Sequence, residues 1–182
     1  MKVLPVTPGR FADLEALFGS NGANSGCWCM WWRIPAKEWT ANGNAGNHAA
    51  LAGAVHSGEP VGLLAYDGGT PVGWVAVAPR YRYPRLLRST TLHLAPDDEP
   101  GVWSVTCFYI HRRHRRSGVA AALLAAAVDH AAGAIVEGYP VDTGDTRRPS
   151  GDLFTGTVPL FTRAGFHVHA RPASGRRVVM RR

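Results

Sequence analysis

The segment from residue 102 to residue 137 constrains the fold of this chain more than any other. Val102–Ile110 is rich in β-branched and aromatic residues and predicts a central β-strand. A basic turn follows, and Ser117 opens an alanine-rich helix that has apolar residues on every side, which indicates burial against a sheet. Ala134–Glu137 reads as the next strand. The segment therefore predicts a strand–turn–helix–strand unit.

The flanking sequence predicts the rest of an α/β fold. Upstream we expect an edge strand at Lys2–Val6, a helix capped by Thr7, and a helix over Asn47–Val55. A hairpin is predicted to join Val61–Tyr66 and Val72–Val77. Downstream the sequence predicts a turn-rich stretch at 139–156, a short helix ending before Gly165, and a final hairpin of Phe166–His169 and Arg177–Met180.

The turn between the central strand and the helix has the composition of an anion site. The first N–H groups of a helix lack intrahelical acceptors, and the helix dipole adds positive potential there. Gly118 allows close approach of a ligand, and the small Ala120 does not block it. We therefore expect residues 115–120 to hold a phosphate or pyrophosphate group.

Charge supports an anionic partner. The chain carries 20 Lys and Arg against 13 Asp and Glu, a net charge of +7, and only Lys2 and Lys37 are lysines. Guanidinium groups match phosphates and carboxylates, so nucleic acid, a phosphorylated cofactor and an acidic substrate are all compatible. Tyr81–Arg85 combines basic and aromatic residues as binders of single-stranded nucleic acid do. No motif of a known nucleic-acid-binding fold accompanies it, so nucleic acid is possible but not favoured.

Composition excludes several other classes. At 182 residues and 46% hydrophobic, the chain matches a single domain over residues 1–182. No run of about 18 apolar residues and no secretory leader is visible, so we expect a cytoplasmic protein without membrane association. The three cysteines, Cys27, Cys29 and Cys107, are expected to be thiols, and their spacing with the histidines does not predict a metal site.

Two motifs resemble the GNAT N-acetyltransferase superfamily. Arg115-x-x-Gly118-x-Ala120, after a hydrophobic strand and before a helix, is similar to its acetyl-CoA signature. Leu160–Phe166 resembles its late helix-to-strand motif, which commonly ends in Gly-Phe. The expected element order also matches, so the resemblance covers most of the chain. It implies an α/β (α+β) fold with a mixed, mostly antiparallel central sheet, flanking helices and a splayed pair of central strands.

The resemblance also implies how acetyl-CoA, the co-substrate, binds. The pantetheine would lie between the Val102–Ile110 and Ala134–Glu137 strands, and an N–H near Phe108 or Tyr109 would polarise the thioester oxygen. An acceptor amine would then attack the thioester directly, without a covalent enzyme intermediate. The implied cofactor-binding residues are Phe108, Tyr109, Ile110, Arg115, Arg116, Ser117, Gly118, Val119 and Ala120.

The sequence departs from the family pattern at two catalytic positions. Many members carry a tyrosine in the late helix as general acid, but the matching residue here is Phe161. Many carry a glutamate on the central strand as general base, but Val102–Ile110 contains no carboxylate. Water relays could replace both groups, as could four residues close to the strand ends: Tyr109, His111, Glu137 and Tyr139.

The acceptor side is expected in residues 20–60, where family members build the acceptor wall. Trp28, Trp31 and Trp32 could stack on a substrate or pack in the core, and Arg33 could hold a carboxylate. The long loop 139–156 favours an enclosed pocket. The sequence therefore predicts an N-acetyltransferase for a primary amine of a small molecule.

Other functions remain open at this point. Acetylation of a protein or an aminoacyl-tRNA is the sister possibility, for which the positive charge would help docking. A non-catalytic module that binds acyl-CoA or nucleic acid is the alternative from a different class. A homodimer is also compatible with the sequence.

Overall fold

The computed structural model describes residues 1–92, 94, 101–144 and 146–182. Within these residues seven strands form one sheet in the order β1-β2-β3-β4-β5-β7-β6, and the pair β4–β5 is parallel while all other pairs are antiparallel. The expected mixed α/β architecture, with a mostly antiparallel sheet, is confirmed. The strands are β1 (Lys2–Pro5), β2 (Gly62–Asp67), β3 (Thr70–Pro79), β4 (Trp103–Ile110), β5 (Val136–Gly138), β6 (His167–Ala170) and β7 (Val179–Arg181); the helices are α1 (Phe11–Phe18), α2 (Ala36–His56), α3 (Pro84–Leu87), α4 (Val119–His130) and α5 (Val158–Arg163).

The predicted hairpin forms β2 and β3. Its turn is closed by Gly68 and Gly69 at φ values of 54° and 84°, a region that favours glycine because it lacks a Cβ atom. β3 then pairs with β4 along most of its length. The four antiparallel strands β1 to β4 thus follow one another in space as they do in sequence.

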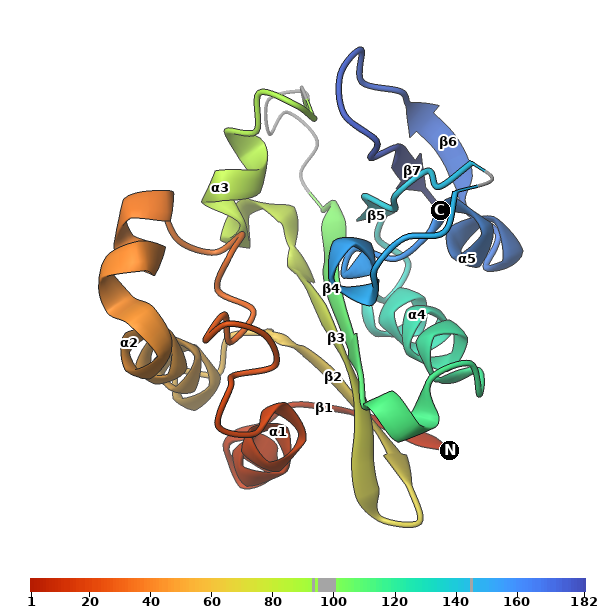
Figure 1. The fold of residues 1–182 in the computed structure, drawn as a ribbon. Coiled ribbons are helices and arrows are strands. Elements are labelled where there is room, and N and C mark those ends of the chain that lie inside the picture. The colour runs from red at the N-terminus through yellow and green to blue at the C-terminus, as the bar shows by residue number, and fades with distance from the viewer. Residues whose placement is uncertain (93, 95–100, 145) are drawn as a thin grey trace.

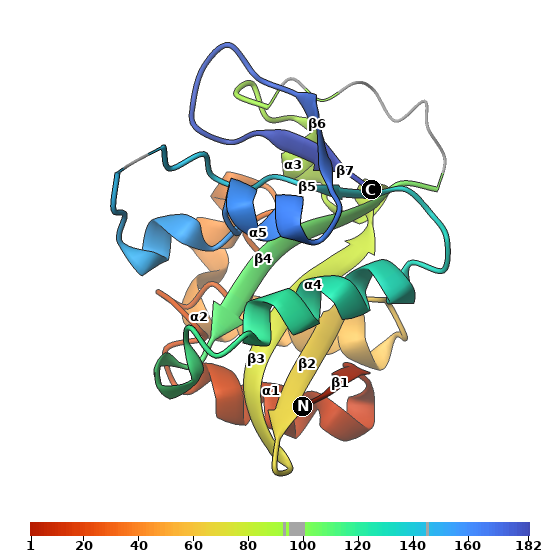
Figure 2. The ribbon, with the colours of Figure 1, turned by 90° about the vertical axis from the view of Figure 1, so that its right-hand side faces the viewer.

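Helices cover both faces of the sheet. α1 and α2 lie on one face, and α4 and α5 lie on the other (Figures 1 and 2). α4 packs against β2, β3 and β4, and a Cβ atom on Gly73 would lie only 2.6 Å from Cγ1 of Val119. The predicted burial of the alanine-rich helix is therefore confirmed, and the glycine in β3 allows the close approach.

The structure corrects three details of the predicted helices. The side chain of Thr7 makes no capping hydrogen bond, and the residues after it, Pro8–Arg10, form a 3-10 turn that precedes α1. α2 begins at Ala36, earlier than the Asn47–Val55 helix expected from sequence, and it contains a kink at Gly43. α4 begins at Val119 and not at Ser117, whose hydroxyl donates to the carbonyl oxygen of His114 at 2.6 Å. The residue before the first turn of α4 is Gly118, at φ 83°.

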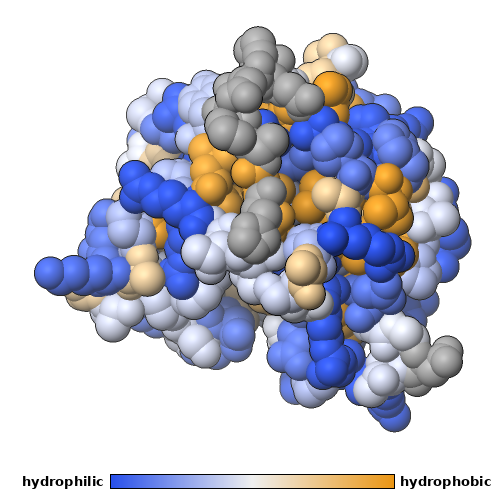
Figure 3. Space-filling model, turned by 90° about the horizontal axis from the view of Figure 1, so that it is seen from above, coloured by the Kyte–Doolittle hydropathy of each residue, from blue (hydrophilic) through white to orange (hydrophobic). Residues whose placement is uncertain are grey.

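The hydrophobic core has two main parts, one on each face of the sheet. One buried cluster lies under α4 and α5 and includes Val75, Leu123 and Phe161, and a second lies under α1 and α2 and includes Leu14, Leu51 and Trp74. Viewed from above, hydrophobic side chains also reach the surface in a central area between more hydrophilic flanks (Figure 3). Among the described residues, no helix is long and apolar enough to cross a membrane.

Candidate functional site

The central strands separate beyond a short parallel segment. β4 and β5 pair only at Trp103↔Val136, Ser104↔Glu137 and Val105↔Gly138. The next residue of β4, Thr106, is the extra residue of a bulge against β3, where Cys107 pairs with Ala76 and Val105 with Val77. A bulge bends the strand that carries it. β4 therefore turns away from β5 at this point, as the predicted splay requires.

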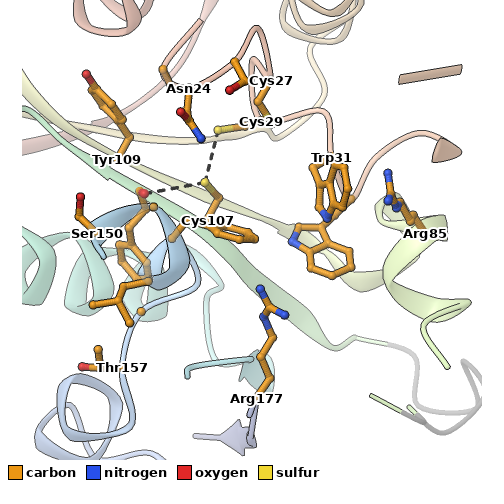
Figure 4. Close-up of a pocket in the computed structure, with 18 of the residues that line it drawn as sticks. Asn24, Cys27, Cys29, Trp31, Arg85, Cys107, Tyr109, Ser150, Thr157 and Arg177 are labelled. Atoms are coloured by element: carbon orange, nitrogen blue, oxygen red, sulfur yellow. Dashed lines mark hydrogen bonds between the residues drawn. The ribbon is translucent and has the colours of Figure 1, made fainter. Parts of the chain in front are cut away.

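A pocket of about 1200 Å³ lies along the separated part of β4 (Figure 4). Its walls come from five parts of the chain: the 23–39 segment, α3 with the residues that follow it, β4 with the start of α4, the 150–163 segment, and Arg177. Segments far apart in sequence thus meet around one cavity. The predicted acceptor segment and the predicted long loop both contribute to its walls.

β4 sends side chains to both sides of the pocket floor. Phe108 and Ile110 belong to the cluster under α4, whereas Cys107 and Tyr109 pack on the cluster under α1 and α2. All four residues line the pocket. Because side chains alternate along a strand, a ligand lying beside β4 would meet both groups.

The backbone N–H of Phe108 faces away from β3. It donates to the carbonyl oxygen of Phe154 at 2.6 Å and not to Val75, the residue of β3 opposite Phe108. N–H groups alternate in direction along a strand. Of the two residues expected to polarise a thioester, Phe108 is the one whose N–H points into the splay, and Phe154 holds that N–H in this structure.

The start of α4 has the geometry of an anion cradle. Arg116 and Gly118 have φ values of 64° and 83°, and a Cβ atom on Gly118 would meet nothing within 4 Å. Arg115 lines the pocket, donating from Nε to the carbonyl oxygen of Ile110 at 3.2 Å and from Nη1 to Oγ of Ser150 at 3.3 Å. The open backbone and the arginine fit a phosphate-bearing ligand.

The predicted cofactor-binding residues divide into two groups. Phe108, Tyr109, Ile110, Arg115 and Ala120 line the pocket. Arg116, Ser117 and Gly118 are exposed at the start of α4 outside that lining, and the side chain of Val119 is buried in the core. The last four residues can therefore contribute backbone N–H groups, but not a side-chain wall.

Of the four candidate catalytic residues, only Tyr109 lines the pocket. The N–H of His111 donates to the carbonyl oxygen of Val72 at 2.9 Å, and its ring lies 5.9 Å from that of His114. Glu137 and Tyr139 are fully buried outside the pocket lining. All four residues lie close to strand ends in the sequence, so this proximity could not show which of them would reach the pocket.

Glu137 is the centre of a buried polar network. Its carboxylate accepts hydrogen bonds from Tyr139 Oη at 2.7 Å and Arg181 Nε at 2.7 Å, and it pairs with Arg80 Nη1 at 3.4 Å. Tyr139 Oη also lies 2.8 Å from Oγ of Ser104. Burial, and then the charge of Glu137, raise the pKa of Tyr139 well above its usual value. These groups satisfy one another and tie β4, β5 and β7 together.

Two of the three predicted acceptor-side tryptophans line the pocket. Trp31 and Trp32 do so, with ring centroids 6.4 Å apart. Trp28 is buried between Phe18 and His48 instead, and its Nε1 donates to Oδ1 of Asn44 at 2.6 Å. The structure therefore places Trp31 and Trp32 at the pocket and Trp28 in the core.

The guanidinium group of Arg33 already binds two groups of the protein. Its Nη2 donates to the carbonyl oxygen of Pro60 at 2.7 Å, and its Nη1 lies 3.5 Å from Oε2 of Glu59. It does not line the pocket. A carboxylate-binding role for Arg33 would require it to give up both partners.

The cysteines are thiols, as expected. Cys29 Sγ and Cys107 Sγ are 3.6 Å apart at the pocket wall, and Nε1 of Trp74 donates to Cys29 Sγ at 3.0 Å. Burial, with the nearby Cys29, raises the pKa of Cys27 to about 11. The described residues hold no group of three or more His, Cys, Asp or Glu side chains that could bind a metal ion.

Sequence reasoning did not place Arg85, Arg177 or Phe154 at the pocket. Arg85 was noted only within the basic and aromatic segment Tyr81–Arg85, Arg177 only at the start of a predicted strand, and Phe154 only as part of a turn-rich loop. All three contact aromatic rings or backbone of distant segments. Nothing in the local pattern around them signals those contacts.

A family model described as the acetyltransferase (GNAT) family matches residues 28–154, more than half of the chain. No curated protein matches the sequence. Many solved structures share the fold. One from Corynebacterium glutamicum, described as a histone acetyltransferase and related acetyltransferase, is 19% identical with a TM-score of 0.57, over 99% of this chain and 94% of that one.

Two further structures carry the same fold at lower identity. A ribosomal-protein-alanine N-acetyltransferase from Brucella melitensis is 13% identical with a TM-score of 0.53, over 100% of this chain and 99% of that one. A PaiA N-acetyltransferase from Thermoplasma acidophilum, in complex with coenzyme A, is 12% identical with a TM-score of 0.54, over 100% of this chain and 97% of that one. At these identities the likeness concerns the fold.

Proposed function

Because the chain belongs to the GNAT acetyltransferase family, we propose that it transfers an acetyl group from acetyl-CoA directly to a primary amine of a small molecule. The observation that carries this proposal is the pocket that runs along the separated part of β4. One end of the pocket reaches the start of α4, and the other is walled by the tryptophans of the 23–39 segment. Two ligands can therefore meet over β4.

The α4 end suits the nucleotide part of acetyl-CoA. Arg115 contributes a guanidinium group at the pocket wall, and residues 116–120 contribute the backbone N–H groups of a helix start. The N–H of Phe108 points into the splay, where it can polarise a thioester oxygen after Phe154 releases it.

The proposed chemistry is a direct substitution at the thioester carbonyl. The amine nitrogen forms the new C–N bond, the C–S bond breaks, CoA leaves as a thiolate that takes a proton from Tyr109, and the proton lost by the amine nitrogen restores Tyr109 through solvent. An attacking amine must be neutral. Arginines line the pocket, and no carboxylate side chain is found among its described lining residues. Positive charge lowers the pKa of a bound ammonium and stabilises a departing thiolate, so the pocket favours both steps without a general base.

Tyr109 is the proposed proton donor to the thiolate. It is the one residue of the four candidates that lines the pocket, and it projects from β4 to the side of Cys107 and the acceptor wall. Phe161, at the position where many family members carry a tyrosine, is fully buried against Phe108 and Phe166 and has no proton to give.

Thermal unfolding with added ligands tests the proposed cofactor. Acetyl-CoA and desulfo-CoA should each stabilise the protein by about 2.7 kcal/mol at a concentration a hundred times the dissociation constant, because both bind only the native state. ATP, which lacks the pantetheine, should have a smaller effect. No stabilisation by either CoA compound at saturating concentration would contradict the proposal.

A further inference from the structure

The pocket is strongly cationic. Among its described lining residues there is no aspartate, glutamate or lysine, but there are five arginines: Arg85, Arg88, Arg115, Arg163 and Arg177. Arg115 lies at the start of α4, and Arg88 and Arg163 are exposed to solvent. The two that are partly buried, Arg85 and Arg177, stand at the tryptophan wall (Figure 4). Neither the helix start nor exposure to solvent accounts for the positions of Arg85 and Arg177.

Arg85 is fixed by stacking and lacks a full set of partners. Its guanidinium carbon lies 3.4 Å from the centroid of the Trp31 ring, and its backbone N–H donates to the carbonyl oxygen of Trp32 at 3.3 Å. Its Nη1 atom is buried and has no hydrogen-bond partner within the described residues. A stacked guanidinium keeps its edge free for an acceptor, and an unpaired buried donor is costly.

Arg177 reaches the same wall from the other side. Its guanidinium carbon lies 5.9 Å from the Trp32 ring and 5.2 Å from the Phe154 ring. Its Nε is also buried without a hydrogen-bond partner in the described part of the chain, and burial lowers its pKa although the charge of Asp152 acts in the opposite direction. The chain contributes no carboxylate within ion-pair distance of Arg85 or Arg177 among residues 1–92, 94, 101–144 and 146–182.

Trp32 supplies a third unpaired donor. The side chain is 8% exposed, it lines the pocket, and its Nε1 has no hydrogen-bond partner among the described residues. Its ring contacts both the Trp31 ring and Arg177. Three donor-only groups therefore surround the acceptor end of the pocket, and a ligand group that only accepts hydrogen bonds would satisfy them.

We propose that Arg85, Arg177 and Trp32 bind a carboxylate of the acceptor, so that the substrate is an acidic amine rather than a polycationic one. This inference rests on the proposed acetyl transfer and deepens it by naming the substrate class. A planar carboxylate can take two N–H donors of one guanidinium and still accept from an indole N–H. A ligand with several ammonium groups would instead meet the guanidinium groups of the five lining arginines. We therefore assign the carboxylate-binding role expected for Arg33 to Arg85 and Arg177. Neither of them forms a salt bridge among the described residues.

Paired ligands that differ in one charge test the proposal. L-alanine and L-alaninamide, and β-alanine and β-alaninamide, in each of which the amide lacks the only carboxylate of the acid, are titrated against CoA-saturated protein and followed by tryptophan fluorescence. Spermidine and phosphoethanolamine complete the panel. We expect the acids to bind about 10- to 100-fold more tightly than their amides, the range given by hydrogen bonds to a charged group.

Matched variants assign the effect to the two arginines. Arg85→Gln and Arg177→Gln should each reduce the acid-to-amide preference by about tenfold or more, while CoA binding persists. Arg176→Gln is the control, because Arg176 is exposed next to Arg177 and does not line the pocket. Thermal unfolding with CoA shows that each variant is folded.

Several results would overturn the proposal. Equal binding of acids and amides, no binding of any acid, or tighter binding of spermidine would each exclude a carboxylate site. Tighter binding of phosphoethanolamine would assign the site to a phosphate instead. A failure of the whole acetyltransferase account is distinguishable, because CoA itself would then not stabilise the protein.

Discussion

The backbone N–H of Phe108 donates to the carbonyl oxygen of Phe154 at 2.6 Å. This bond crosses the splay between β4 and β5 and is made by a loop rather than by a strand. The same N–H is the one proposed to polarise the thioester. The segment that carries Phe154 must therefore give up this bond before the reaction can occur.

Hydrogen exchange should detect that release. On saturation with acetyl-CoA, we expect amides of residues 150–156 to exchange faster and amides at the start of α4 to exchange more slowly, because the first segment loses its bond to β4 and the second gains a ligand. Peptide-resolved exchange mass spectrometry measures both. If residues 150–156 are unchanged while α4 is protected, the N–H of Phe108 is not used by the thioester.

Arg115→Ala should weaken acetyl-CoA binding. Arg115 is the pocket-lining arginine at the start of α4, and the loss of one exposed, charge-assisted hydrogen bond should raise the KM for acetyl-CoA about tenfold, more at low salt than at high salt. Arg113→Ala is the control, because Arg113 is exposed and lies outside the pocket lining. Equal effects of the two changes would show that general positive charge, not this position, attracts the cofactor.

Glu137→Gln should destabilise the protein without removing catalysis. The change leaves the buried Arg80 and Arg181 without the negative charge of their shared partner, which should cost about 3 kcal/mol of unfolding free energy in a denaturant titration. The kcat per folded molecule should stay close to that of the unchanged protein. A large loss of kcat with unchanged stability would return Glu137 to the list of catalytic groups.

Tyr109→Phe should reduce catalysis without destabilising the protein. Only the phenol oxygen is removed, so the stability should change little, whereas kcat should fall about 100-fold if Tyr109 protonates the leaving thiolate. The loss should be smaller for an acyl donor whose leaving thiol is more acidic. An unchanged kcat would favour a water relay, or stabilisation of the thiolate by the arginines alone.

Stability should fall at alkaline pH. The pKa of Cys27 is raised to about 11 by burial, and that of Tyr66 to about 12 by burial and its hydrogen bond to Asp13. A group with a raised folded-state pKa loses its proton first in the unfolded chain, so the folded state loses stability as pH rises above the unfolded-state value. Cys27 alone should cost about 2 kcal/mol between pH 9 and 11.

Denaturant titrations at several pH values measure this loss. Cys27→Ala should flatten the decline between pH 9 and 11, and Tyr81→Phe should not, because Tyr81 is 59% exposed. A decline that is the same in both variants would place the responsible groups elsewhere.

The sequence predicted the fold well because its signals are local. The hairpin turn at Gly68 and Gly69, the strand that became β4, and the apolar helix α4 each follow from short-range pattern and turn chemistry. The glycine-containing start of α4 was likewise found where the pattern placed it, with Gly118 at a positive φ. Phe161 is fully buried, which agrees with the expectation that this residue takes no part in proton transfer.

The site was less predictable because its partners are distant in sequence. Glu137 meets Arg80 and Arg181 across 57 and 44 residues, and no local pattern shows that these charges neutralise one another in the core. Residues 19–35 form successive turns with positive φ at Trp28 and Cys29, so neither helical nor strand periodicity tells which tryptophan faces the pocket.

The most direct test of the account is a parallel measurement of thiol release from acetyl-CoA and of N-acetylated product by mass spectrometry. With a panel that includes acidic, neutral and polycationic amines, we predict equal molar amounts of CoA thiol and N-acetyl product for at least one acidic amine. The rate should rise with pH as that amine loses its proton. Thiol release that does not depend on any amine, or no release from a protein that binds acetyl-CoA, would contradict the account.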